Sequence, residues 1–216
     1  MANNQVLLND SIVVISPQYC TPNQVDLYIA KRIKKITEGR NLGVFDINGN
    51  NIFKVIKSSL FSSRRILLDS AGVPLVSLKP MKFSVPRRWK VYRGDSSDSK
   101  DMLFSVKRSN FLQFKSSFDV FLASNTEEHA CDFKIKQNFS RKSCFIYQGD
   151  SDSIIAEMHK NKAARDNVHG KDRFLATVYP NVDYAFVIAM RAVLDEFNTA
   201  RKRGIAGANG GGGGGG

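Results

Sequence analysis

The sequence predicts a mainly β fold of the α+β class, in which about 12 short strands form a sandwich or a closed barrel around one C-terminal helix. Two observations carry this prediction. A hairpin pattern recurs between residues 42 and 160, and a segment near the C-terminus is apolar on nearly every face of a helix. Of the 216 residues, 42% are apolar and 24% are charged, so the chain can bury a core of its own.

Five hairpins are expected in the central part of the chain. In each, a short run of β-branched or aromatic residues leads through a polar turn into an alternating run. The turns are rich in Asp, Asn, Gly and Ser, which reach positive φ or bond their own backbone and so let the chain reverse. The expected hairpins span residues 44–55, 67–78, 91–106, 120–135 and 145–158.

Three further strands are expected outside these hairpins, at Ser11–Ile15, Val25–Ile29 and Phe174–Tyr179. The segment Asp26–Glu38 is ambiguous. Its apolar residues recur at the spacing of a helix face, while residues 25–29 alternate as a strand does. The strand is the favoured interpretation.

The strongest helix prediction covers Asn181 to Phe197. Asn181 follows Pro180 and is the candidate N-cap, and Asp183 falls in the first turn, near the positive end of the helix dipole. Residues 185–190 are apolar all round the helix. A helix of this kind must be surrounded by protein, so we expect the sheet to wrap it.

The chain is predicted to form one domain, residues 11–199, between a flexible N-terminus of residues 1–10 and a flexible, basic and glycine-rich tail of residues 200–216. The longest apolar run, residues 184–194, is interrupted by Arg191 and is about half of the roughly 20 residues that a membrane-spanning helix needs. A buried helix is therefore expected there.

Three cysteines, Cys20, Cys131 and Cys144, lie far apart and form no C-x-x-C motif. Their number and spacing indicate neither a disulfide framework nor a zinc site, which fits a reducing compartment. No secretory signal is recognisable at the N-terminus. We therefore expect a cytoplasmic protein, with a peripheral-membrane or a nuclear location as the alternatives. We also expect a monomer.

No catalytic pattern emerges from the sequence. The three histidines, His129, His159 and His169, stand near turns or strand ends without a metalloprotease or nucleophile-elbow motif. The loop Asp95–Asp101 is acidic, but it lacks the glycine and distal glutamate of a calcium loop. We accordingly predict no enzyme activity, no catalytic residue, no bound metal and no cofactor.

The net charge of +12 and the isoelectric point near 9.7 make an anionic partner the main functional expectation. Between residues 79 and 93 there are six cations and no acid, with aromatic residues interleaved. These six candidate ligand-binding residues are Lys79, Lys82, Arg87, Arg88, Lys90 and Arg93.

A strand through the 79–93 segment would place its charges on one side. If Trp89 and Val91 point inward, then Arg88, Lys90 and Tyr92 share the outer face. Two other basic clusters cover residues 31–35 and 134–142. The alternative reading of any one cluster is a solvated surface, or an edge strand whose lysines and arginines prevent aggregation.

Several segments together resemble the LURP-one-related proteins of plants. They are the Asp46–Gly49 and Asp69–Pro74 turns, Trp89–Gly94, Val106–Ser109, Cys131–Phe133 and above all Val178–Phe186. The resemblance covers roughly residues 13 to 198. Its motifs are structural rather than catalytic.

This resemblance implies a fold similar to the C-terminal domain of tubby and to phospholipid scramblases, a closed 12-stranded antiparallel barrel around a central C-terminal helix. It also implies a role in plant defence. The leading functional hypothesis is non-enzymatic binding of anionic phospholipid or phosphoinositide surfaces. The alternatives are a nucleic-acid-binding protein, a membrane-tethered transcriptional regulator and, least favoured, a scramblase-like lipid transporter.

Overall fold

The computed structural model describes residues 11–31, 41–59, 63–81, 84, 87–111, 115–140, 142–160 and 171–209. Of residues 110, 111, 115, 171, 172 and 202–209 it describes the backbone only. Lys82, one of the predicted ligand-binding residues, and His169 lie outside the described part of the chain.

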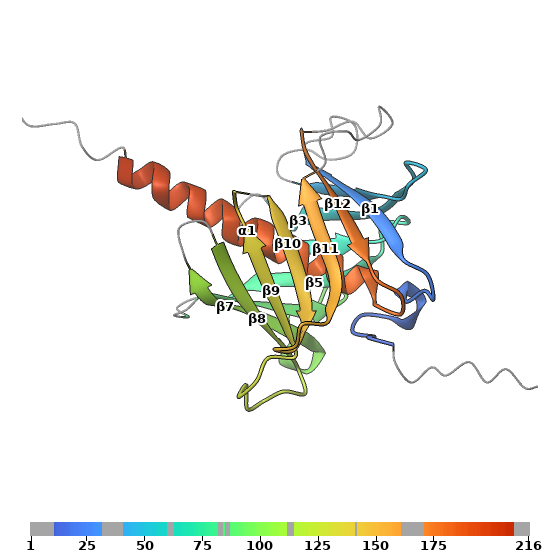
Figure 1. Cartoon of the computed structure of the whole chain (residues 1–216), viewed down its shortest axis with the longest axis horizontal. Helices are drawn as coiled ribbons and strands as arrows, with labels where there is room; N and C mark the ends of the chain where they lie inside the picture. Colours follow the sequence, from blue (N-terminus) through green and yellow to red (C-terminus); the bar gives the residue numbers. More distant parts are fainter. Residues whose placement is uncertain are drawn as a thin grey trace, which may run out of the picture.

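Twelve antiparallel strands close into one barrel, in which each strand pairs with its neighbours in sequence and β1 pairs with β12 (Figure 1). The strands are β1 (Val25–Lys31), β2 (Leu42–Phe45), β3 (Asn51–Lys57), β4 (Arg65–Leu68), β5 (Pro74–Pro80), β6 (Arg88–Arg93), β7 (Met102–Phe111), β8 (Lys115–Leu122), β9 (Phe133–Asn138), β10 (Ser143–Gln148), β11 (Ile154–Lys160) and β12 (Lys171–Val178). The predicted mainly β fold and the closed barrel are thus confirmed.

The five expected hairpins all form, and two of them turn through the same four-residue pattern. In Asp46–Gly49 and Asp69–Gly72 the glycine N–H donates to the aspartate carbonyl at 3.1 Å. Gly72 has a φ of 85°, which glycine reaches without the steric cost that a Cβ would add. The Asp69 side chain accepts from the N–H of Val73 at 2.8 Å, so this residue helps to fix the strand register.

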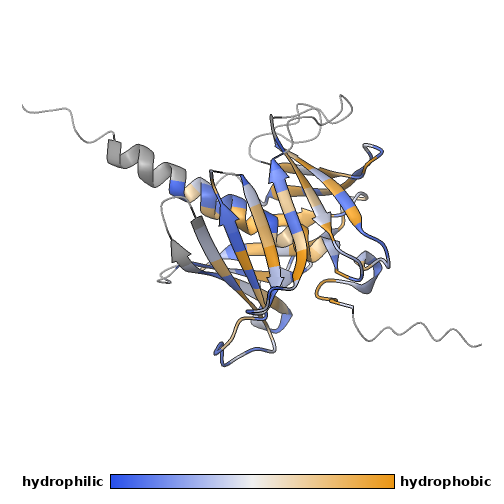
Figure 2. Cartoon of the chain, in the orientation of Figure 1, coloured by the Kyte–Doolittle hydropathy of each residue, from blue (hydrophilic) through white to orange (hydrophobic). Residues whose placement is uncertain are grey.

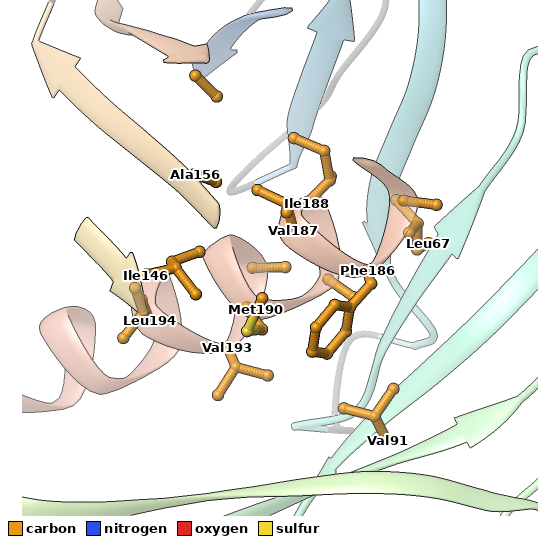
Figure 3. Close-up of a cluster of buried hydrophobic side chains, with 14 of the residues drawn as sticks. Leu67, Val91, Ile146, Ala156, Phe186, Val187, Ile188, Met190, Val193 and Leu194 are labelled. Carbon is orange, nitrogen blue, oxygen red and sulfur yellow. The ribbon is translucent and has the colours of Figure 1, made fainter. Parts of the chain in front are cut away.

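A long helix, α1 (Tyr184–Asn209), runs through the barrel and projects from one end (Figure 1). Its first turns are covered on every side: Phe186, Val187, Met190, Val193 and Leu194 are all completely buried. Figure 3 shows these side chains meeting inward-facing residues of several strands, and Figure 2 shows the alternation of polar and apolar residues along the strands. The predicted central helix is therefore confirmed, and it fills the interior.

The N-terminal segment differs from its prediction. Residues 11–15 form no strand of the barrel; only Ile12 makes an isolated bridge, to Val182. The reason lies in Asp183, whose fully buried carboxylate accepts the N–H groups of residues 14, 15 and 16 at 3.2, 2.6 and 3.1 Å. These backbone donors are satisfied by a side chain and need no neighbouring strand.

The helix start was also predicted a few residues too early. Asn181 has a φ of 61° and lies in the turn before the helix, so it is not the N-cap. Asp183 takes that role, because its other carboxylate oxygen accepts from the N–H of Phe186 at 3.0 Å. One buried carboxylate thus caps α1 and holds the N-terminal segment against it.

The helix ends later than predicted. Residues 200–209, assigned to a flexible tail, continue α1. The 26 residues of the helix span about 39 Å, which exceeds the roughly 23 Å of a seven-residue strand, so the helix must emerge from the barrel. Arginine and lysine are good helix formers, and Arg201 stacks on Phe139 at the barrel rim, with 4.1 Å from Cζ to the ring centroid.

In the ambiguous segment, Val25–Lys31 is a strand, and residues 32–38 lie outside the described residues.

Replacing Asp183 by asparagine should lower the free energy of unfolding by about 3–5 kcal/mol. The amide keeps the size of the side chain, but its NH₂ group would face backbone donors, and several buried N–H groups would lose a charged acceptor. Urea unfolding followed by circular dichroism measures the change. Asp152→Asn, at an exposed hairpin position, should change stability by less than about 0.5 kcal/mol. Equal stability of the two variants would contradict this role for Asp183.

Candidate functional site

Four cations share the outer face of three neighbouring strands. Lys79 on β5, Arg88 and Lys90 on β6 and Lys107 on β7 form what we call the outer basic patch. The strand register places Lys79 opposite Lys90 and Arg88 opposite Lys107. On the same β6 strand Trp89 and Val91 are buried in the core, so the predicted alternation holds for Arg88 and Lys90. Tyr92, predicted to share their outer face, is buried instead.

The facing lysines Lys79 and Lys90 of the outer basic patch cost stability. Like charges directly opposite each other in antiparallel strands repel. Within the described part of the chain, neither Lys79 nor Lys90 forms an ion pair. These two lysines do not protect a sheet edge, because β6 is hydrogen-bonded to a neighbour on both sides and the barrel has no free edge there.

Two acids border the outer basic patch: Glu128 pairs with Arg88, and Asp119 of β8 stands opposite Lys107 in the strand register. Arg88 donates from Nη2 to Oε2 of Glu128 at 2.6 Å, and its guanidinium lies 5.8 Å from the centroid of the Phe121 ring. This hydrogen bond, with the charges of Lys107 and Lys90, holds the pKa of Glu128 below its ordinary value, although burial opposes the shift. Glu128 thus neutralises one of the four cations.

The other predicted ligand-binding residues lie elsewhere. Arg87 lies one position before β6, at the end of the barrel from which α1 emerges. Its charge helps to lower the pKa of Arg108. Arg93 ends β6 at the opposite end of the barrel, and its Nη1 donates to the carbonyl of Ile15 at 2.9 Å. Of the five predicted residues that the structure describes, Lys79, Arg88 and Lys90 therefore come together on the outer face.

A pocket that sequence reasoning missed lies at the end of the barrel from which α1 emerges. This helix-exit pocket has a volume of about 400 Å³ and is bounded by α1 and by residues of β1 and of β9 to β12. Its charged lining residues, among those described, are Lys31, Lys142, Lys160, Arg191, Arg201 and Asp195. Five cations against one carboxylate leave the lining with a net charge of +4.

Arg191 is the most enclosed cation of the helix-exit pocket. Its side chain is only 6% exposed, and its guanidinium lies over the ring of Phe174, 4.5 Å from the centroid. Nη1 stands 3.7 Å from Oδ1 of Asp195 but has no hydrogen-bond partner among the described residues. Asp195 also pairs with Lys31, so one carboxylate serves two cations.

Neighbouring groups add to this charge and polarity. Burial, together with repulsion from Arg87 and Arg201, lowers the pKa of the Arg108 guanidinium, which lies over the ring of Phe197. In the pocket wall, the buried Oε1 of Gln137 also has no hydrogen-bond partner within the described residues. The pocket therefore offers both a buried donor and a buried acceptor.

Sequence signals pointed toward parts of the helix-exit pocket, since the basic clusters at residues 31–35 and 134–142 contain Lys31 and Lys142. Arg191 interrupts an otherwise apolar run, which is unusual for a helix buried inside a sheet. The other cations of the lining could not be assigned, because Lys31, Lys142 and Arg201 are far apart in sequence and come together only when the barrel closes.

Among the described residues, no helix is both long and apolar enough to cross a membrane. No group of three or more His, Cys, Asp or Glu side chains lies close enough together to hold a metal ion, within the same residues.

The fold and these surfaces define a class of protein: a closed antiparallel β-barrel filled by its own C-terminal helix and carrying basic surfaces. The chain belongs to the LURP-one-related family, whose model matches residues 25–195. It is 44% identical over 188 residues to LURP-one-related protein 15 of Arabidopsis thaliana, covering 86% of each chain. It is 42% identical over 190 residues to protein LURP1 of the same plant, with 87% of this chain and 91% of that protein covered. An X-ray structure of an Arabidopsis thaliana protein matches with a TM-score of 0.67 and 39% identity over 86% of this chain and 98% of that one.

Cys144 in the wall of the helix-exit pocket should be almost inert in the native protein. Complete burial raises the pKa of its thiol to about 12, with Arg191 acting in the opposite direction. At pH 8 such a thiol is about one part in ten thousand thiolate, whereas an ordinary cysteine with a pKa near 8.5 is about one quarter thiolate. Alkylation of native Cys144 by iodoacetamide, followed by peptide mass spectrometry, should be more than about a hundredfold slower than in the unfolded chain.

The pH dependence of the alkylation rate tests the direction of the pKa shift of Cys144. The alkylation rate of Cys144 should keep rising above pH 9, where the rate of an ordinary cysteine levels off. The half-buried Cys20 serves as an internal comparison and should react faster. A native rate for Cys144 equal to that of the unfolded chain would contradict the burial of this thiol.

Proposed function

We propose that the protein is a non-enzymatic binding domain that recognises anionic phospholipid surfaces through the outer basic patch. A lipid surface presents many negative charges in a plane, and each lysine or arginine close to it contributes about 1 kcal/mol. Lys79, Arg88, Lys90 and Lys107 lie on three adjacent strands and present their charges in one direction. A role in plant defence is part of the proposal and rests on the family alone.

The facing lysines Lys79 and Lys90 support this proposal most directly. Their repulsion destabilises the free protein, and a bound anionic surface would relieve it. The barrel interior, where a β-barrel enzyme could hold a substrate, is filled by α1. A binding role therefore fits better than catalysis.

Replacing Lys79 and Lys90 together by glutamine should weaken binding to vesicles of equal parts phosphatidylserine and phosphatidylcholine by about 30-fold, because two cations at about 1 kcal/mol each are lost. Arg88 is left in place, since its removal would strand Glu128. Sedimentation with vesicles measures the binding. Raising the salt should release the parent protein, because the Debye length falls from about 10 Å at 0.1 M to about 3 Å at 1 M.

A matched control removes the same charge elsewhere. Lys100→Gln with Lys136→Gln, both at exposed positions away from the patch, should change binding several-fold less than the patch variant. Glu128→Gln should act in the opposite direction and strengthen binding, because it removes the acid that pairs with Arg88. Sedimentation of the Lys79→Gln, Lys90→Gln variant at the level of the parent would overturn the proposal. Tighter binding of the parent to duplex DNA than to these vesicles at matched salt would favour a nucleic-acid partner instead.

A further inference from the structure

We propose that the helix-exit pocket is a binding site for a phosphate monoester carried on a small, partly apolar body. This site is separate from the outer basic patch, which lies on the outside of β5, β6 and β7. The proposal stands on three features of the pocket: a buried arginine with an unused donor, an excess of positive charge, and apolar walls.

The buried arginine is the first feature. A guanidinium that is 94% buried costs free energy unless its charge and its donors are satisfied. Arg191 shares the single carboxylate of Asp195 with Lys31, and its Nη1 has no hydrogen-bond partner in the described part of the chain. An apolar side chain at this position would pack on Phe174 without that cost. The unused donor points to an anionic oxygen as its partner.

The excess of charge is the second feature, and it selects the kind of anion. Lysines and arginines outnumber carboxylates by five to one in the described lining. A phosphate monoester carries about −1.5 to −2 charges near neutral pH and offers three acceptor oxygens, so it complements this lining better than a carboxylate does. Arginine also matches phosphate geometry by donating two parallel hydrogen bonds.

The apolar walls are the third feature. Met158, Phe174 and Leu194 line the helix-exit pocket beside Arg191, and Phe139 stands with Arg201 at its rim. The volume of about 400 Å³ falls within the roughly 300–1,000 Å³ of small-molecule sites and exceeds what inorganic phosphate alone would fill. The ligand therefore has a body attached to its phosphate, and that body contacts carbon.

The two sources of such a group are a soluble phosphorylated metabolite and a phospholipid whose headgroup is a phosphate monoester. Phenyl phosphate is the soluble probe, and vesicles of phosphatidylcholine containing phosphatidic acid are the lipid probe. Weaker binding of the pocket variants to phenyl phosphate alone assigns a soluble ligand. Weaker binding to both probes assigns a headgroup, and either result supports the site.

Isothermal titration of the full chain with phenyl phosphate should give saturable binding of one molecule per chain. Arg191→Leu should weaken it by roughly ten- to a hundredfold, the loss expected for a hydrogen bond to a charged group. Benzyl alcohol, which lacks the phosphate, should not bind measurably, and benzoate should bind more weakly than phenyl phosphate. Thermal unfolding checks that each variant is folded.

A second variant keeps the test decisive if Arg191→Leu fails to fold. Lys142→Gln with Arg201→Gln changes two cations of the lining that are not fully buried, and it should weaken phenyl phosphate binding several-fold. Lys100→Gln with Lys136→Gln is the charge-matched control and should have no effect. Lys79→Gln with Lys90→Gln should also leave phenyl phosphate binding unchanged, so this proposal and the phospholipid proposal can fail separately. Absence of phenyl phosphate binding, unchanged binding in a folded pocket variant, or benzoate binding as tight as phenyl phosphate would overturn the assignment.

Discussion

The carboxylate of Asp183 fixes where the central helix enters the barrel. It is fully buried, accepts backbone hydrogen bonds from residues 14–16, and caps the first turn of α1 through Phe186. With its start held there, the apolar residues 185–190 must lie inside the barrel and Arg191 must follow them toward the far end. The position of the helix-exit pocket therefore depends on a cap about two turns of helix away.

Much of this fold could be predicted from local patterns, because hairpins are specified by residues close together in sequence. Asp69 and Gly72 encode their turn within four residues, and the alternation around Trp89 placed Arg88 and Lys90 on the outside. The errors arose where a distant residue decides the structure. Residues 11–15 have the composition of a strand, but the carboxylate of Asp183 satisfies the backbone that follows them.

The two basic surfaces likewise differ in how far residues close together in the sequence could predict them. The outer basic patch could be predicted in part, since Lys79, Arg88 and Lys90 belong to one basic segment of the sequence, but Lys107 joins it only through the pairing of β6 with β7. The helix-exit pocket was hidden, because its cations come from separate strands and from a helix that the sequence alone ends too early, before Arg201. The cations of the helix-exit pocket come together only when the barrel closes. In the closed barrel every strand is paired on both sides, so β6 has no free edge.

Filling a barrel with its own helix leaves function to the outer faces and the two ends, and here charge concentrates on one outer face and at one end. The most direct measurement is a crystal structure of the protein with phenyl phosphate. Its phosphate should lie within hydrogen-bonding distance of the Arg191 guanidinium, with the ring against Phe174. A structure in which the ligand binds elsewhere, with both terminal nitrogens of Arg191 hydrogen-bonded to protein groups, would contradict anion recognition in this pocket.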